Sequence, residues 1–166
     1  MILIIKTNKE RLHDLEFVKP VFDVVKNSLN NKNTKIFVKH YSKLTSKDIN
    51  KTDKIIICGT SLKDNQFLED INKFEWIENF KKPLLGICAG SHIIGIVLGY
   101  KVRKKMQIGL KNIQINNFLG MKERRQVYHL HNYQVLPEIF HKENIYAVLF
   151  HPEVRNKELI VNFYKS

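Results

Sequence analysis

The sequence predicts an α/β fold, a three-layer, doubly wound sandwich around a mostly parallel sheet. In the first hundred residues, short apolar runs alternate with segments whose apolar residues recur at spacings of three and four. The runs lack polar alternation, which is typical of parallel strands buried on both faces. Right-handed crossovers then place helices on both sides of the sheet. The 166 residues, 43% of them apolar, fit one domain spanning residues 1–166.

The elements of the first hundred residues follow this alternation in order. Strands are expected at Ile2–Ile5, Thr34–Val38, Lys54–Cys58 and Leu84–Cys88. A helical stripe runs over residues 15–29, with Pro20 marking either its start or a kink. A second stripe covers residues 67–77, and a helix is expected over Ala89–Leu98.

The second part of the chain reads differently. Residues 111–115, 124–131 and 145–150 look like strands with short connections, and residues 156–164 look like a closing helix.

Charge and cysteine content limit the partners and the compartment. The net charge is +12, but lysine is spread along the chain and the densest basic cluster covers residues 101–105. This distribution favours an acidic protein over nucleic acid as the partner. Only Cys58 and Cys88 occur, so a reducing cytoplasm is expected. No apolar run is long enough for a membrane span, and the apolar N-terminus reads as a strand, not a signal peptide.

Cys88 ends an apolar strand immediately before a helix, and Gly86 and Gly90 flank it two residues away on either side. This G-x-C-x-G pattern matches a nucleophile elbow with Cys in place of Ser. The turn is sharp, so small flanking residues let strand and helix approach. The helix N-terminus favours a thiolate, and the N–H of Ala89 is a candidate oxyanion donor. A small buried cysteine packed in the core is the competing interpretation.

A thiolate nucleophile needs a histidine base and a group that orients it. The apolar run 145–150 ends in His151-Pro152-Glu153, where proline stops the strand. His151 and Glu153 leave the chain two residues apart, so the carboxylate can hold one ring nitrogen while the other faces Cys88. A backbone-bonded histidine and a solvated acid are the alternatives. No metal is expected, because His129, His131 and His141 lack a matching Cys or Asp cluster.

Together, "LLGICAGSHIIGIVLG" and "VLFHPEV…NFY" resemble a class I glutamine amidotransferase domain. The resemblance implies a flavodoxin-like fold and a triad in which Cys88 is the nucleophile, His151 the general base and then acid, and Glu153 the orienting carboxylate. It also implies release of ammonia from glutamine for a separate synthase partner, without a cofactor. Gly59, in "DKIIICGTSL", is similar to the family's turn glycine that provides an oxyanion N–H.

The resemblance also suggests the residues that contact the substrate. "HLHNYQV" is similar to the family strand that holds the amino-acid end of glutamine, which points to His131, Asn132 and Tyr133. Thr60 stands in the turn where the family has glycine, and His92 stands where many members have a glutamine that contacts the substrate. These departures alter the glutamine pocket more than the triad.

Other functions of the same triad stay open. A γ-glutamyl hydrolase or related thiol hydrolase would use the same three residues and would explain the altered pocket. A catalytically silent subunit that regulates a synthase is the alternative from a different class. The stress-response thiol proteins share the "ICAG" elbow, but His151-Pro152-Glu153 near the end of the sequence argues against them.

Overall fold

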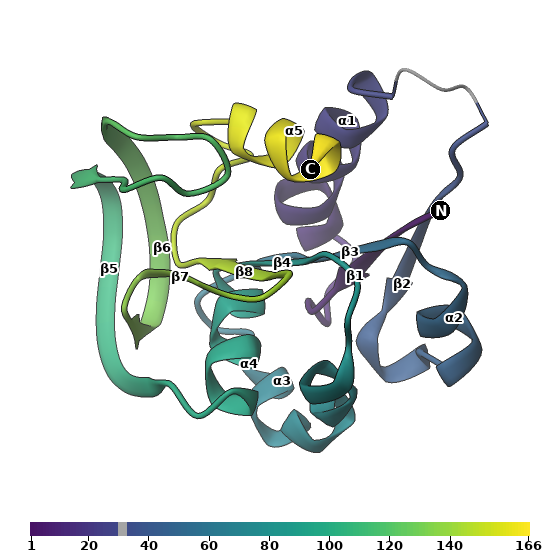
Figure 1. The fold of residues 1–166 in the computed structure, drawn as a ribbon. Helices are drawn as coiled ribbons and strands as arrows, with labels where there is room; N and C mark the ends of the chain where they lie inside the picture. Colours follow the sequence, from purple (N-terminus) through teal and green to yellow (C-terminus); the bar gives the residue numbers. More distant parts are fainter. Residues whose placement is uncertain (30–32) are drawn as a thin grey trace.

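The computed structural model of the protein describes residues 1–29 and 33–166, which form two sheets (Figure 1). The larger has six strands in the order β2-β1-β3-β4-β8-β7, and the smaller is the hairpin β5-β6. The strands are β1 (Ile2–Lys6), β2 (Ile36–His40), β3 (Lys54–Ile57), β4 (Leu84–Ile87), β5 (Lys101–Gln114), β6 (Arg124–Leu136), β7 (Ile139–Lys142) and β8 (Ile145–Val148). The helices are α1 (Lys19–Asn27), α2 (Ser46–Lys51), α3 (Gln66–Glu69), α4 (Ala89–Val97) and α5 (Glu158–Lys165).

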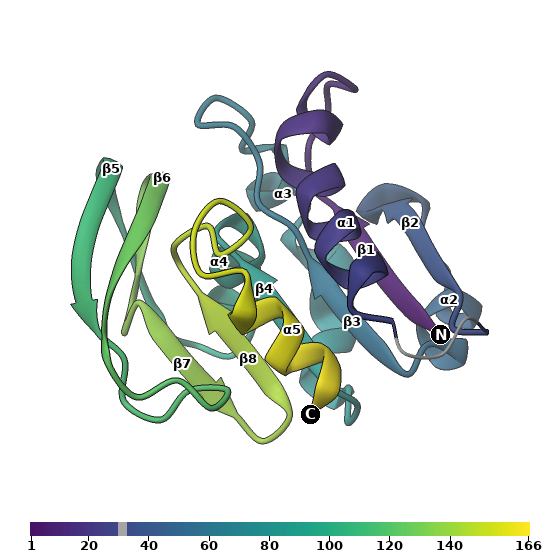
Figure 2. The same cartoon turned by 90° about the horizontal axis from the view of Figure 1, so that it is seen from above.

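The larger sheet confirms the predicted fold class. Strands β1, β2, β3, β4 and β8 run parallel, and only β7, at one edge, is antiparallel to its neighbour β8. Helices α1 and α5 cover one face of the sheet, and α2, α3 and α4 lie on the other (Figures 1 and 2). The result is the three-layer sandwich that unbroken apolar strands separated by helices predict.

Alternate residues of each central strand enter opposite halves of the core. Ile2 and Ile4 of β1 pack in the half that also contains Val21 of α1 and Phe163 of α5. Leu3 and Ile5, which point to the other face, pack with residues of α3 and α4. All four β1 side chains are at most 3% exposed. Burial on both faces explains why the strand carries no polar alternation.

Two of the predicted helical stripes have a different form in the structure. The first begins as a π-helical turn at Asp14–Val18 and becomes α1 at Lys19. Pro20 therefore lies in the first turn of α1, where proline is favoured because its fixed φ suits the start of a helix. The stripe over residues 67–77 is divided between the short α3 and a 3₁₀ helix at Ile71–Asn79. Apolar spacing alone does not separate these helix types.

Other differences concern elements with little apolar patterning. Strand β5 begins at Lys101, ten residues before the strand predicted at 111–115, because its first half is exposed and basic. Helix α2 was not predicted, although Thr45 and Asp48 form a capping box at its start. Strand β7 was also missed, and β2 is shifted to Ile36–His40.

Candidate active site

Cys88 occupies a strained turn between β4 and α4. It is the N-cap residue of α4 and has φ 48° and ψ −100°, a backbone conformation that residues other than glycine rarely adopt. Its N–H donates to the carbonyl of Val148 at 2.9 Å, which fixes the turn against β8. The Cys88 side chain is therefore held at the carboxyl end of the sheet, where the first N–H groups of α4 begin.

Gly86 and Gly90 are required by the close packing around this turn. A Cβ on Gly86 would lie 2.6 Å from the carbonyl carbon and oxygen of Gly90. A Cβ on Gly90 would lie 2.3 Å from the carbonyl oxygen of Ile57 on β3. Both distances are shorter than van der Waals contact, so strand and helix pack this closely only with glycine at both positions.

His151 and Glu153 form a buried pair just after β8. His151 Nδ1 and Glu153 Oε1 are 2.6 Å apart, and the two residues are 1% and 2% exposed. The other carboxylate oxygen, Oε2, and the ring Nε2 have no hydrogen-bond partner among the described residues. The backbone N–H of His151 donates to the carbonyl of Tyr128 on β6 at 2.8 Å, and Phe17 packs near the ring at 5.5 Å between centroids.

The charges around His151 favour its protonated form. Burial lowers the pKa of a histidine, but the carboxylate of Glu153 and then the sulfur of Cys88 raise it, so the pKa of His151 lies well above its usual value. The structure thus brings Cys88, His151 and Glu153 together at one end of the sheet, although Cys88 and His151 lie 63 positions apart in the sequence.

Gly59 lies against both Cys88 and His151. A Cβ built on Gly59 would be 2.6 Å from Cε1 of His151 and 3.2 Å from Cβ of Cys88. The hydroxyl of Thr7 donates to the carbonyls of Cys58 at 3.1 Å and Gly59 at 3.4 Å. Because N–H and C=O point in opposite directions in a trans peptide, the N–H groups of Gly59 and Thr60 are directed away from Thr7.

Thr60 and Ala89 lie beside these residues. Thr60 is buried, and its hydroxyl donates to Asp64 at 3.3 Å. Ala89 is the first residue of α4 and is 2% exposed. Its N–H is therefore among the first N–H groups of the helix, which lack an intrahelical acceptor.

His92 faces the hairpin from the first turns of α4. It is 3% exposed, and its Nε2 lies 2.8 Å from the carbonyl of Tyr133. Burial lowers the pKa of His92 to about 4, against the effect of that hydrogen bond. The ring is therefore neutral at pH 7 and donates from Nε2 to Tyr133, while Nδ1 is buried without a partner among the described residues.

His129 and His131 form a buried pair of imidazole rings on β6. Nδ1 of His129 and Nε2 of His131 are 3.0 Å apart, and both residues are at most 1% exposed. Burial lowers the pKa of His131 and brings the pKa of His129 to about 4. In residues 1–29 and 33–166, no three His, Cys, Asp or Glu side chains are grouped so as to hold a metal ion.

Strand β6 covers the sulfur of Cys88. The thiol donates to the carbonyl of Leu130 at 3.4 Å, and Cys88 is 3% exposed. The side chain of Asn132 donates to the carbonyl of Leu62 at 2.6 Å, which ties β6 to the turn that follows Gly59. Leu130, Phe17 and Thr7 were missed in the sequence, since a backbone carbonyl and single side chains in distant elements leave no local pattern.

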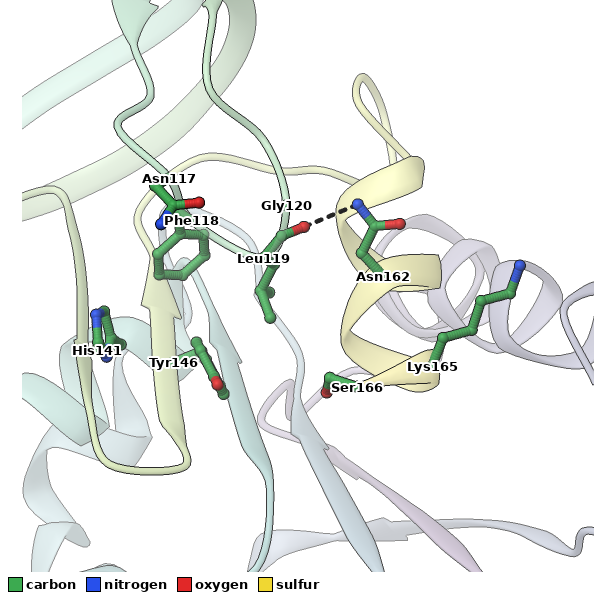
Figure 3. Close-up of a pocket in the computed structure, with 9 residues that line it drawn as sticks. All are labelled: Asn117, Phe118, Leu119, Gly120, His141, Tyr146, Asn162, Lys165 and Ser166. Carbon is green, nitrogen blue, oxygen red and sulfur yellow. Dashed lines mark hydrogen bonds between the residues drawn. The ribbon is translucent and has the colours of Figure 1, made fainter.

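A cavity of about 590 Å³ lies elsewhere, between the 117–120 turn, β7–β8 and the end of α5 (Figure 3). Phe118, Tyr146 and Asn162 are among the residues that line it, and the Asn162 side chain donates to the carbonyl of Leu119 at 2.8 Å. None of the predicted site residues lines this cavity. This cavity is therefore separate from the turn that holds Cys88.

A strained cysteine at a strand–helix turn, facing a buried histidine–carboxylate pair, defines the thiol-nucleophile class of α/β proteins. Residues 15–143 match the family described as "Glutamine amidotransferase class-I". The chain belongs to the class I glutamine amidotransferase family. The matched residues include Cys88 and end before His151.

Relatives and solved structures agree with this assignment. The chain is 30% identical over 142 residues to the GMP synthase [glutamine-hydrolyzing] of Thermotoga petrophila, a match that covers 70% of this chain and 28% of that protein. It is 27% identical over 144 residues to a subunit of the GMP synthase [glutamine-hydrolyzing] of Saccharolobus solfataricus, covering 72% and 77% of the two chains. A crystal structure of a putative GMP synthase subunit from Thermoplasma acidophilum superposes with a TM-score of 0.79 at 18% identity, covering 99% and 92%.

The chain thus spans less than a third of the length of the Thermotoga protein and about three quarters of that of the Saccharolobus subunit. In residues 1–29 and 33–166, none of the helices has the length and apolar character needed to cross a lipid bilayer.

Proposed function

We propose that the chain is a glutaminase subunit, with residues 1–166 acting as one catalytic domain, that releases ammonia from the side-chain amide of glutamine. One observation carries the proposal: the strained Cys88 and the 2.6 Å His151–Glu153 pair meet at the carboxyl end of the sheet. Family membership supports glutamine as the substrate. Because Cys58 and Cys88 are both free, the expected location is a reducing compartment such as the cytoplasm.

The first half of the reaction forms a thioester. The Cys88 sulfur, having passed its proton to His151, attacks the side-chain carbonyl carbon of glutamine. The carbonyl oxygen becomes an oxyanion, for which the N–H groups of Ala89 and Gly59 are the proposed donors. Protonated His151 then gives its proton to the leaving amide nitrogen, the carbon–nitrogen bond breaks, and ammonia leaves. The raised pKa of His151 supports this role as an acid.

The second half restores the enzyme. His151 takes a proton from water, whose oxygen attacks the thioester carbon, and the carbon–sulfur bond breaks to release glutamate. Glu153 holds Nδ1 throughout and stabilises the imidazolium, so it orients the base without taking the proton. No step in this sequence requires a cofactor.

We assign substrate contacts to Thr60 in the turn after Gly59, to His92 on α4, and to His131, Asn132 and Tyr133 on β6. Their support is position: β6 crosses the Cys88 sulfur, and His92 holds the Tyr133 carbonyl. Because His92 is neutral, its contribution is a fixed hydrogen-bond donor and a shaped wall, not a positive charge.

We propose a separate synthase as the acceptor of the ammonia. The Saccharolobus relative is named as one subunit of a glutamine-hydrolysing GMP synthase, so the complementary subunit of such an enzyme is the first partner to test. A γ-glutamyl hydrolase would instead release glutamate from longer γ-glutamyl substrates without a partner.

The test is ammonia release from glutamine, assayed with the chain alone and with the complementary synthase subunit from the same organism. Cys88→Ser should abolish release, and acid quenching of the wild type should trap a glutamyl thioester on Cys88. Cys58→Ala is the matched control, because Cys58 is also a buried free cysteine but directly follows the neighbouring strand β3. Release that survives Cys88→Ser would refute the assignment, and preference for γ-glutamyl peptides over glutamine would favour the hydrolase.

A further inference from the structure

The hairpin β5–β6 presents an exposed apolar strip. Met106, Ile108 and Leu110 alternate along β5 and are 67%, 57% and 57% exposed. Ile108 pairs with Leu130 and Leu110 with Tyr128, so the half-buried Leu130 and Tyr128 side chains extend the same face of the hairpin. We call these five residues the hairpin strip. Three strongly exposed aliphatic side chains in a row are unusual for a surface that faces only water.

Basic residues border the hairpin strip. Residues 101–136 contain eight lysines and arginines and one acidic residue, Glu123, so this fifth of the sequence carries more than half of the net charge of +12. Lys101, Arg103, Lys104 and Lys105 are exposed at one end of β5. Glu138 pairs with Lys111 and Glu158 with Arg125, whereas the four basic residues at the start of β5 form no ion pair with any other described residue.

The edge of β5 is also free to pair. Among the described strands, β5 pairs only with β6, and it forms the outer side of the molecule (Figures 1 and 2). A second copy of this chain would bring two strongly basic strands together, which like-charge repulsion opposes. Nucleic acid would suit the charge, but the centre of the face is aliphatic apart from Tyr128, and a single aromatic side chain offers little of the stacking and polar contact that such ligands need.

The opposite edge of the hairpin touches the active site. The carbonyl of Tyr128 accepts from the His151 N–H, and the carbonyl of Leu130 accepts from the Cys88 thiol. These are the β6 residues that pair with Leu110 and Ile108. A ligand that contacts Ile108 on the hairpin strip is therefore one cross-strand pair away from Leu130, the residue whose carbonyl covers Cys88.

The Leu130 carbonyl blocks the approach to Cys88. Its oxygen lies 3.4 Å from the sulfur and accepts from the thiol, so it stands where a ligand would have to reach the nucleophile. It also lies over a sulfur that is 3% exposed. A shift of β6 that withdraws this carbonyl would open the Cys88 sulfur to a ligand.

We propose that the hairpin strip and its basic border are the docking surface for the synthase partner, which binds through an apolar strip edged by carboxylates, and that docking withdraws the Leu130 carbonyl from Cys88. The identity of the occupant rests on the proposed function. Apolar contacts provide the buried centre of such an interface, and the opposite charges provide orientation and rapid association.

The experiment uses the intact chain and the complementary GMP synthase subunit from the same organism. Ile108→Glu tests the hairpin strip, the pair Lys104→Glu and Lys105→Glu tests the border, and Val38→Glu is the control. Val38 is 44% exposed on β2, the strand at the other side of the larger sheet. Binding is measured by calorimetry at low and moderate salt, and access to Cys88 by its rate of alkylation with iodoacetamide.

We expect the wild type and Val38→Glu to bind alike, and both test variants to bind at least about tenfold more weakly. Moderate salt should weaken the wild type more than the border variant. Alkylation of free protein should be slow in every variant and should rise about tenfold or more when the partner binds the wild type. Equal binding by Ile108→Glu, absence of binding by the wild type, or binding without faster alkylation would overturn the proposal.

These outcomes are separable from failure of the proposed function. Binding that depends on the hairpin strip, without hydrolysis of glutamine in the complex, would refute the glutaminase assignment and leave the docking surface intact. If Cys88→Ser abolishes hydrolysis of glutamine but Ile108→Glu does not affect it, the glutaminase assignment stands and the docking surface is refuted. Binding of a homopolymeric RNA in competition with the synthase partner would assign the basic border to nucleic acid and overturn the choice of occupant.

Discussion

The neutral state of buried His92 gives the protein a defined sensitivity to acid. Its folded pKa is about 4, whereas an unfolded histidine titrates near 6.5. Below about pH 6.5, His92 binds a proton in the unfolded chain but stays neutral in the folded chain. The free energy of unfolding therefore falls as the pH falls towards 4. At about 1.4 kcal/mol per pH unit in that window, His92 alone should cost about 2 kcal/mol between pH 7 and pH 5.

His92→Gln isolates this effect. Glutamine lacks the titration but keeps an N–H donor that can reach the carbonyl of Tyr133. Urea unfolding, followed by the fluorescence of Trp76, is measured at pH 7 and pH 5 for both proteins. The wild type should lose about 2 kcal/mol more than the variant, which corresponds to an additional midpoint shift on the order of 1 M urea.

Groups that titrate elsewhere contribute equally to both proteins and cancel in this comparison. His141→Gln is the matched control, because His141 is exposed on β7, and it should follow the wild type. If wild type and His92→Gln lose the same stability between the two pH values, His92 does not titrate as its burial requires, and its role as a fixed neutral donor is wrong.

Three other substitutions test the geometry of the site. Gly59→Ala should lower glutamine hydrolysis by about 100-fold or more, measured as kcat, because its Cβ would lie 2.6 Å from the His151 ring and displace it. Gly90→Ala should instead lower the thermal midpoint, since its Cβ would meet the rigid carbonyl of Ile57 at 2.3 Å, a clash of about 1–3 kcal/mol; an unchanged midpoint would show that α4 can move away from β3. Glu153→Gln should lower kcat by about 100-fold or more while the thioester still forms, and a pH–rate profile identical to that of the wild type would contradict its role in setting the charge of His151.

Much of the larger sheet could be predicted because its sequence signal is local. Strands β1, β3 and β4 are uninterrupted apolar runs, which is the pattern expected of strands buried on both faces. The turn at Cys88 could also be predicted from the sequence. Close packing on both sides of a sharp turn permits only glycine at positions 86 and 90, and this leaves a recognisable pattern.

The hairpin could not be predicted in the same way. The first half of β5 is defined by pairing with β6 across a register irregularity near residues 104–107, and its side chains are basic and exposed. Nothing in its own sequence distinguishes it from a charged loop. The cover over Cys88 has the same origin, because it is the backbone carbonyl of Leu130, and a carbonyl is present at every position of every sequence.

His92 and His151 show how the site assigns different tasks to similar side chains. Both are at most 3% exposed, so burial penalises the charged form of each. His92 has only a carbonyl dipole on Nε2, which is too weak to offset that penalty, and it stays neutral. His151 has a carboxylate on Nδ1 and a sulfur beyond, and their combined charge reverses the effect of burial. Glu153 in turn would be costly to bury as a lone carboxylate, so each member of the pair stabilises the other's charge in the core. Of the four buried histidines near Cys88, only His151 has a raised pKa, whereas the pKa values of the other three are lowered. The acid step of the reaction is therefore assigned to His151, the ring that faces the sulfur.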